Sequence, residues 1–176
     1  MKHLNIEIKA RCSDQNKIRY ILSSNNADFK GVDYQTDTYF RVNSGRLKLR
    51  EGNIENKLIF YDRENVTGPK RSNTILLDYD SGTSLKEILL KSLGQLVIVD
   101  KRREIFFIDN VKFHLDSIKD LGTFVEIEAI DENGDIGKEK LLEQCNRFLE
   151  LFGIEEKDLV ADSYSDLLLR KMMERI

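Results

Sequence analysis

Charged side chains occupy alternate positions in five short segments of this chain, and side chains of these types can bind phosphate oxygens or divalent cations. The segments are residues 5–9, 46–50, 101–103, 112–116 and 126–128. In an extended strand, successive side chains point to opposite faces, so the charged residues of each segment share one face. Basic and acidic segments are separate from one another. The pattern predicts several strands whose charged faces line a common interior.

The alternative for any one strand is an ordinary amphipathic strand. Its charges would lie in water and form cross-strand ion pairs worth about 0.2–1 kcal/mol each. That alternative is favoured for a single strand, and the shared interior is favoured for all of them jointly. An uncompensated buried charge costs several kcal/mol, so a basic interior needs acids or a bound anion beside it. A triphosphate fits, because arginine can bind its oxygens bidentately and lysine can neutralise them.

The acidic side chains in these segments supply hard oxygen donors. Mg²⁺ and Mn²⁺ prefer such carboxylates, together with water and substrate phosphates. The sequence therefore indicates a divalent cation, Mg²⁺ or Mn²⁺, as the cofactor. The candidate metal ligands are Glu7, Asp116, Glu126 and Glu128.

Length and composition predict one domain over residues 1–176. The chain is 34% charged and 40% apolar, yet its net charge is only −3, which argues against a general nucleic-acid binder. It has no apolar run of membrane-spanning length and no signal-peptide pattern at its start, so we expect a cytoplasmic protein with no membrane partner. Cys12 and Cys145 lack a metal-binding spacing and are expected to be reduced thiols.

Periodicity and turn residues predict an α+β fold dominated by an antiparallel sheet that closes into a barrel. Helices are expected after the cap at residues 13–14, after a capping box at 84–87, over 138–152 and from the Ser163 cap onward. Residues 62–73, which include the only proline, are expected to form a mobile loop. Besides the first strand, strands are expected at residues 34–42, 46–51, 57–63, 74–79, 97–99, 101–108, 111–116 and 123–130.

Several of these segments resemble the CYTH superfamily, also called the triphosphate tunnel metalloenzymes. The likeness rests on residues 7–9, 45–51, 101–104 and 124–128, and on the ending at 162–168. The superfamily takes in class IV adenylyl cyclases and thiamine triphosphatases, and the ending is similar to the class IV cyclase-like branch. One departure is clear, since Asn5 stands where the family signature Glu-x-Glu-x-Lys has its first glutamate.

The resemblance implies an eight-stranded antiparallel barrel with helices packed outside and a tunnel for a triphosphate and a divalent metal. Glu7 and Lys9 would be catalytic. The resemblance places metal at Glu7, Asp116, Glu126 and Glu128. Phosphate oxygens would be bound by Lys9, Arg46, Lys48, Arg50, Arg63, Lys101 and Arg103.

Three functions remain open on the sequence alone. Hydrolysis of ATP, thiamine triphosphate or tripolyphosphate is ranked first, because it demands less of the site than cyclisation does. Cyclisation of ATP to cyclic AMP and pyrophosphate would use the same equipment. A non-catalytic polyphosphate or nucleotide sensor is the third possibility.

The roles of Asp37 and Tyr39 are also open, since they either lie at the edge of the tunnel or simply pack against their neighbours. A homodimer is compatible with this class of protein.

Overall fold

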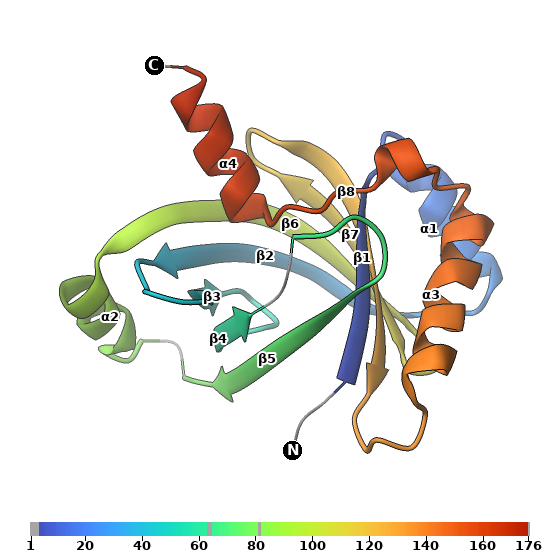
Figure 1. Cartoon of the computed structure of the whole chain (residues 1–176), viewed down its shortest axis with the longest axis horizontal. Coiled ribbons are helices and arrows are strands. Elements are labelled where there is room, and N and C mark those ends of the chain that lie inside the picture. Colours follow the sequence, from blue (N-terminus) through green and yellow to red (C-terminus); the bar gives the residue numbers. More distant parts are fainter. Residues whose placement is uncertain (1–3, 63–64, 81, 176) are drawn as a thin grey trace.

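The strands in the described part of the chain all belong to one antiparallel sheet (Figure 1). The computed structural model describes residues 4–62, 65–80 and 82–175, and the strands named here lie within them. They are β1 (Leu4–Arg11), β2 (Asp28–Phe40), β3 (Arg46–Glu51), β4 (Lys57–Asp62), β5 (Lys70–Asp78), β6 (Gln95–Ile108), β7 (Val111–Ile118) and β8 (Gly122–Asp131).

The sheet closes on itself into a barrel with the order β1-β5-β4-β3-β2-β6-β7-β8. Closure occurs where β1 pairs with β8 on one side and with β5 on the other. A closed barrel leaves no unpaired edge and turns every second side chain of each strand inward. The α+β fold with an eight-stranded antiparallel barrel, predicted from the sequence, is confirmed for the part of the chain that the structure describes.

Helices cover the outside of the barrel unequally. They are α1 (Gln15–Ser24), α2 (Leu85–Leu93), α3 (Lys138–Phe152) and α4 (Tyr164–Met173), with a short 3₁₀ turn η1 (Glu156–Asp158) before α4. Figure 1 shows α1 and α3 beside β1 and β8, α2 at the far end of the barrel, and α4 above β6. Their caps follow the sequence for α1, where the Asp14 side chain accepts from Lys17 N, and for α4, where Ser163 and Asp166 form a capping box.

The main apolar core lies between the outer faces of β1, β7 and β8 and the helices α1 and α3. Ile8, Phe113 and Ile127 point outward from their strands and pack there with Leu141 and Phe148. These apolar residues alternate with the charged ones, so their burial under α3 directs the charged side chains to the inside. Core packing therefore sets the register on which the interior depends.

A second apolar cluster lies at the end of the barrel that α4 covers. It joins Tyr39, Tyr61, Phe124 and Leu168 to Tyr164, the first residue of α4. The segment before α4 crosses this end, and Val160 N donates a 2.9 Å hydrogen bond to the Lys9 carbonyl oxygen. The start of α4 is therefore fixed directly over the interior.

The sequence predicted a mobile loop at residues 62–73, and this prediction is wrong for the end of that segment. Its last residues belong to β5, which begins at Lys70 and pairs with β1 through Lys70 opposite Glu7. Polar, turn-like composition suggested a loop, but pairing with β1 closes the barrel and overrides local propensity. Thr74, the expected start of this strand, lies in its middle.

Three smaller differences separate the elements from the expectation. The strands expected at residues 97–99 and 101–108 are one strand, β6, because Asp100 stays in the ladder and accepts a 2.8 Å hydrogen bond from Thr36 Oγ1. β2 begins at Asp28 rather than at residue 34. The Ser84 side chain makes no capping hydrogen bond, so the expected capping box is absent from α2.

None of the described helices is long and apolar enough to cross a bilayer.

Candidate functional site

The barrel interior contains a cavity of about 180 Å³ with a strongly charged wall. Because the barrel is closed, strands that are distant in the sequence contribute side chains to the same space. Eight residues that the sequence predicted to bind phosphate or metal line the cavity from β1, β3, β6 and β8. They are Glu7, Lys9, Lys48, Arg50, Lys101, Arg103, Glu126 and Glu128.

Two other predicted residues, Arg46 and Asp116, do not line this cavity. Arg46 lines a second cavity, of about 260 Å³, next to the start of α4, and its Nη2 donates a 2.8 Å bond to Asp166 Oδ2. Asp116 is fully buried behind Arg103. Arg63 lies outside the described residues. The sequence predicted Arg46 as a phosphate ligand and Asp116 as a metal ligand. Arg46 instead pairs with Asp166, and both oxygens of Asp116 are bound by Arg103, so Asp116 is not on the cavity wall and is left out of the metal ligands proposed below.

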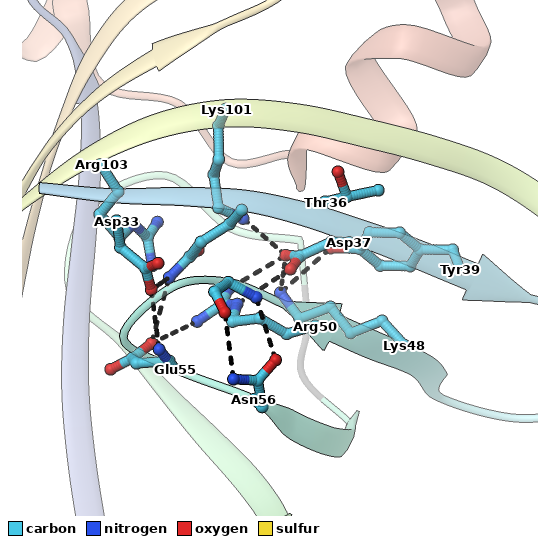
Figure 2. A network of polar contacts seen from close by, with 12 residues as sticks. Asp33, Thr36, Asp37, Tyr39, Lys48, Arg50, Glu55, Asn56, Lys101 and Arg103 are labelled. Atoms are coloured by element: carbon cyan, nitrogen blue, oxygen red, sulfur yellow. Dashed lines mark hydrogen bonds and ion pairs between the residues drawn. The ribbon is translucent and has the colours of Figure 1, made fainter. Parts of the chain in front are cut away.

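Asp37 on β2 holds three of the cavity's cations (Figure 2). Its carboxylate accepts from Arg50 Nε at 2.9 Å, from Lys48 Nζ at 2.9 Å and from Lys101 Nζ at 2.6 Å. Burial by itself would raise the pKa of Asp37, but these cations hold it well below its usual range. Asp37 therefore fixes the positions of the basic side chains from β3 and β6.

Arg103 is fixed by a second buried carboxylate. Its Nε and Nη2 donate to the two oxygens of Asp116 at 2.7 and 2.6 Å, a bidentate arrangement that orients the guanidinium plane. Nη2 also donates to Glu126 Oε2 at 3.0 Å. The hydroxyl of Tyr164 donates to Asp116 Oδ2 at 2.8 Å, so α4 supports this pair from its first residue.

Lys9 lies where β1 meets the start of α4. Its Nζ is 3.3 Å from Glu126 Oε1 and 3.9 Å from the centroid of the Tyr164 ring. It also donates a 3.4 Å hydrogen bond to the Asp162 carbonyl oxygen. The ammonium group is buried and faces the cavity, a position from which it can contact a bound anion.

Glu55 enters the cavity from the turn between β3 and β4. Its Oε2 accepts from Arg50 Nη1 at 3.0 Å, and its Oε1 accepts from Lys112 Nζ at 2.7 Å. Burial raises the pKa of Glu55, but Lys112 and Arg50 lower it below the usual range of a glutamate. Glu55 is thus an ionised carboxylate that joins β3 to β7 across the interior.

The acidic part of the wall lies on β1 and β8. Asn5 Nδ2 donates a 2.8 Å hydrogen bond to Glu128 Oε1, and Glu7 pairs with Glu128 in the strand register. Burial, and then the Glu7 carboxylate, raise the pKa of Glu128 to about 7. Two carboxylates and an amide therefore converge, and the charged form of Glu128 is disfavoured there.

This acidic part fits a hard divalent cation. Among the described residues, the buried Asn5 Oδ1 has no hydrogen-bond partner, so one amide oxygen is available beside two carboxylates. Oxygen donors of this kind are what Mg²⁺ and Mn²⁺ prefer. Within the described ranges, no three acidic, histidine or cysteine side chains already form a metal-binding group.

His114 on β7 is buried beside the same wall. Its Nδ1 lies 3.1 Å from Glu126 Oε2, while its buried Nε2 has no hydrogen-bond partner in the part of the chain described. Burial, and then the charge of Arg103, lower the pKa of His114 to about 4. The ring is therefore neutral at physiological pH. Burial by itself would raise the pKa of Glu126, but Arg103 and Lys9 hold it well below its usual range, so the ionised carboxylate accepts a hydrogen bond from the Nδ1–H of His114.

Sequence reasoning missed the role of Asp37 and missed Glu55 entirely. Asp37 follows the same alternation as Tyr39, but an isolated aspartate within a β-rich segment gives no sign of its partners. Glu55 lies in a turn, where a charged residue is usually a solvated one. The alternation at residues 112–116 predicted that Lys112 faces inward. This was the signal available in the sequence that a buried carboxylate partner such as Glu55 is needed.

Comparison with known proteins agrees with the family resemblance seen in the sequence, and it does so over almost the whole chain. The model of the CYTH domain family matches residues 3–164. A relative named "Putative adenylate cyclase MJ0240", from Methanocaldococcus jannaschii, is 25% identical over 175 residues, covering 93% of this chain and 98% of the relative.

Solved structures share the fold. The PH1012 protein from Pyrococcus horikoshii superposes with a TM-score of 0.75 at 23% identity, covering 93% of this chain and 98% of that protein. HpAC1 from Hippeastrum, described as an adenylyl cyclase candidate with a dominant triphosphatase activity, gives a TM-score of 0.59 at 14% identity and covers 96% of this chain and 95% of its own. With the family model matched over most of the sequence, the chain belongs to the CYTH domain family.

Proposed function

We propose that this protein hydrolyses a triphosphate inside the barrel with the help of a divalent cation, Mg²⁺ or Mn²⁺. The observation that carries the proposal is the division of one cavity into a basic wall and an acidic part. Lys48, Arg50 and Lys101 are gathered by Asp37, while Glu7 and Glu128 face them from β1 and β8. Membership of a family with triphosphatase and cyclase-like members supports an enzyme.

The charge balance of the cavity supports binding of the substrate together with a cation. Among the described residues, seven lysine and arginine side chains and four glutamates line the cavity, and Asp37 and Asp116 lie behind them. The interior is therefore close to neutral. A triphosphate carries several negative charges, and a divalent cation at the acidic part would offset the excess.

The acidic residues would hold the cation and the basic residues would hold the phosphates. Metal would be bound by Asn5, Glu7, Glu126 and Glu128, and its chemistry would be to lower the pKa of a nucleophile and neutralise phosphate charge. In this proposal Glu7 and Lys9 are the catalytic pair. Lys9, next to Glu126, would donate a charged hydrogen bond to the reacting phosphate.

The remaining basic side chains would position the phosphate chain. Phosphoryl transfer asks a protein mainly for alignment and charge stabilisation. Arg50 and Arg103 are already oriented by Asp37 and Asp116, so they need little reorganisation when an anion arrives. Lys48 and Lys101 would neutralise the leaving group.

Cyclisation of ATP is the second candidate, and the second cavity favours it. That cavity, of about 260 Å³, shares Tyr39 with the first and is lined by Phe40, Val42, Arg46 and Ser165. A mixed apolar and polar pocket suits the organic part of a nucleoside triphosphate. The relative from M. jannaschii carries a cyclase name, which agrees with this alternative.

A product assay with ATP, thiamine triphosphate and tripolyphosphate, each with Mg²⁺ and with Mn²⁺, tests the proposal. We expect metal-dependent release of orthophosphate, and the preferred substrate would define the subclass. Formation of cyclic AMP and pyrophosphate would show that the protein is a cyclase rather than a hydrolase. Tight binding of all three compounds without any product would leave only a sensor.

Restoring the family's first glutamate with Asn5→Glu should tighten Mn²⁺ binding by about tenfold, because ligand charge count sets affinity for hard cations. The new carboxylate would lie next to Glu128, which already accepts from Asn5, so the metal-free variant should also be less stable. Calorimetric titration with Mn²⁺ measures the affinity. Asn5→Gln, which adds length without charge, is the control, and equal affinities for the two variants would contradict a metal site at position 5.

A further inference from the structure

Glu55 differs from Asp37 and Asp116 in its position relative to the cavity. Asp37 and Asp116 project from strands, are fully buried and contact their arginines from behind. Glu55 projects from the turn between β3 and β4 and itself lines the cavity. Figure 2 shows it below Arg50, on the side of the guanidinium opposite Asp37.

The contacts of Glu55 use the hydrogen-bond donors that a bound anion would need. Asp37 takes Nε and Nη2 of Arg50, which leaves Nη1 for Glu55 at 3.0 Å. Lys112 Nζ, from the opposite wall, donates to the other oxygen of Glu55 at 2.7 Å. Arginine and lysine donors that are bridged by a carboxylate in this way are of the type that also bind phosphate oxygens.

The turn is built to hold Glu55 in this position. Asp33, which is fully buried, accepts from the backbone N–H of Ile54 at 2.9 Å and of Glu55 at 3.0 Å. Gly52 passes so close that a Cβ there would lie 2.5 Å from Asp33 Oδ1, so only glycine fits without a shift. Asn56 closes the turn through the backbone of Gly52.

Resting on the function proposed above, we propose that Glu55 is an internal counter-anion that substrate phosphate must displace from Arg50 and Lys112. Glu55 would therefore determine which anions the site accepts. An anion binds there only if it offers more charge and more oxygen acceptors than the carboxylate it replaces. A triphosphate meets this condition, and a singly charged anion does not. Glu55 thus neutralises the basic wall while the cavity is empty of substrate.

Calorimetric titration with tripolyphosphate, without divalent cation, tests the proposal on the full chain. We expect Glu55→Gln to bind tripolyphosphate at least about tenfold more tightly than wild type, since the competing charge is gone. The matched control is Glu51→Gln on the same hairpin, where Glu51 pairs with the partly exposed Lys86. The control should bind as wild type does.

Thermal unfolding supplies a second readout. Without ligand, Glu55→Gln removes the carboxylate from Lys112 and leaves Arg50 with Asp37 alone, so the variant should unfold at a lower temperature than wild type. Tripolyphosphate should raise the unfolding temperature of the variant by more than that of wild type. If the glutamine variant does not fold, Glu55→Asp keeps the charge but is too short for both contacts. The aspartate variant should then bind tripolyphosphate more tightly than wild type, and equal or weaker binding would overturn the counter-anion role.

Unchanged or weaker tripolyphosphate binding by Glu55→Gln would overturn the counter-anion role and make Glu55 a ligand of substrate or metal instead. This outcome is separate from failure of the proposed function. Wild-type protein that binds tripolyphosphate but releases no orthophosphate would refute hydrolysis and leave the comparison of the variants intact. Absence of metal-free binding in both proteins would overturn the counter-anion role, whereas hydrolysis is tested by the product assay with Mg²⁺ and Mn²⁺.

Discussion

Glutamine in place of Glu128 should raise the free energy of unfolding of the metal-free protein at about pH 8 by on the order of 2 kcal/mol. In the folded protein, burial and the Glu7 carboxylate raise the pKa of Glu128 from 4.5 to about 7. Folding therefore favours the protonated form. The stability from this group is fully present below pH 4.5 and is lost as the pH rises through about 7. Partial exposure of the side chain reduces the expected effect below the full shift.

The glutamine variant escapes this loss because it is neutral at every pH. Its amide oxygen can still accept the hydrogen bond from Asn5, so the local geometry is kept. Urea unfolding at about pH 5 and pH 8 measures the difference, which should be small at the lower pH and large at the higher. Glu87→Gln, which changes an exposed residue of α2, is the control and should be neutral at both.

The same substitution should abolish stabilisation by Mn²⁺. A carboxylate that destabilises the ligand-free protein is favourable once a cation neutralises it, so wild type gains stability on adding metal and the variant does not. A variant that gained as much from Mn²⁺ as wild type would exclude Glu128 as a ligand. A variant no more stable than wild type at the higher pH would contradict a disfavoured charged form of Glu128.

Asparagine in place of Asp37 should destabilise the protein by about 3–5 kcal/mol, the usual cost of leaving buried charges without their partner. Asp37 is fully buried and accepts from Arg50, Lys48 and Lys101. The neutral amide cannot balance these three cations. The NH₂ group of the asparagine is a donor, so only the amide oxygen can accept hydrogen bonds from the three cations. Urea unfolding of the metal-free variant measures the loss.

A substitution of the same type at an exposed ion pair provides the comparison for Asp37. Asp78 pairs with Lys57 at 2.6 Å, but its side chain is 82% exposed, so Asp78→Asn should cost less than about 1 kcal/mol. Tripolyphosphate should recover part of the stability lost in Asp37→Asn, since it supplies negative charge to the same cations. Similar small losses for both variants would mean that Asp37 carries no special electrostatic role.

The two substitutions have opposite signs because the barrel uses its acids in two ways. Asp37 and Asp116 lie behind arginines and lysines and hold them in place. Glu128 lies beside Glu7, and burial together with that carboxylate outweighs the effect of Lys112, so its charged form is disfavoured in the absence of metal. This difference is a property of the surroundings, since the residues themselves are all simple carboxylates.

The alternation of charged and apolar residues was sufficient to predict the strands and their inward faces. It works at residues 5–9, 46–50 and 126–128 because side-chain direction in a strand is a local property with a period of two. Eight predicted site residues consequently line one cavity. Local signals failed at Lys70, where polar composition suggested a loop and pairing with β1 made a strand.

The sequence by itself therefore determined the fold class, the family likeness and which side chains face inward. Only the tertiary structure decided which charges meet. It placed Arg46 with Asp166 next to a second cavity, put Asp116 behind Arg103, and brought Glu55 from a turn to Arg50 and Lys112. Such partnerships depend on strand order, register and barrel closure. These features are set by long-range pairing and by packing under α1 and α3, so no local pattern encodes them.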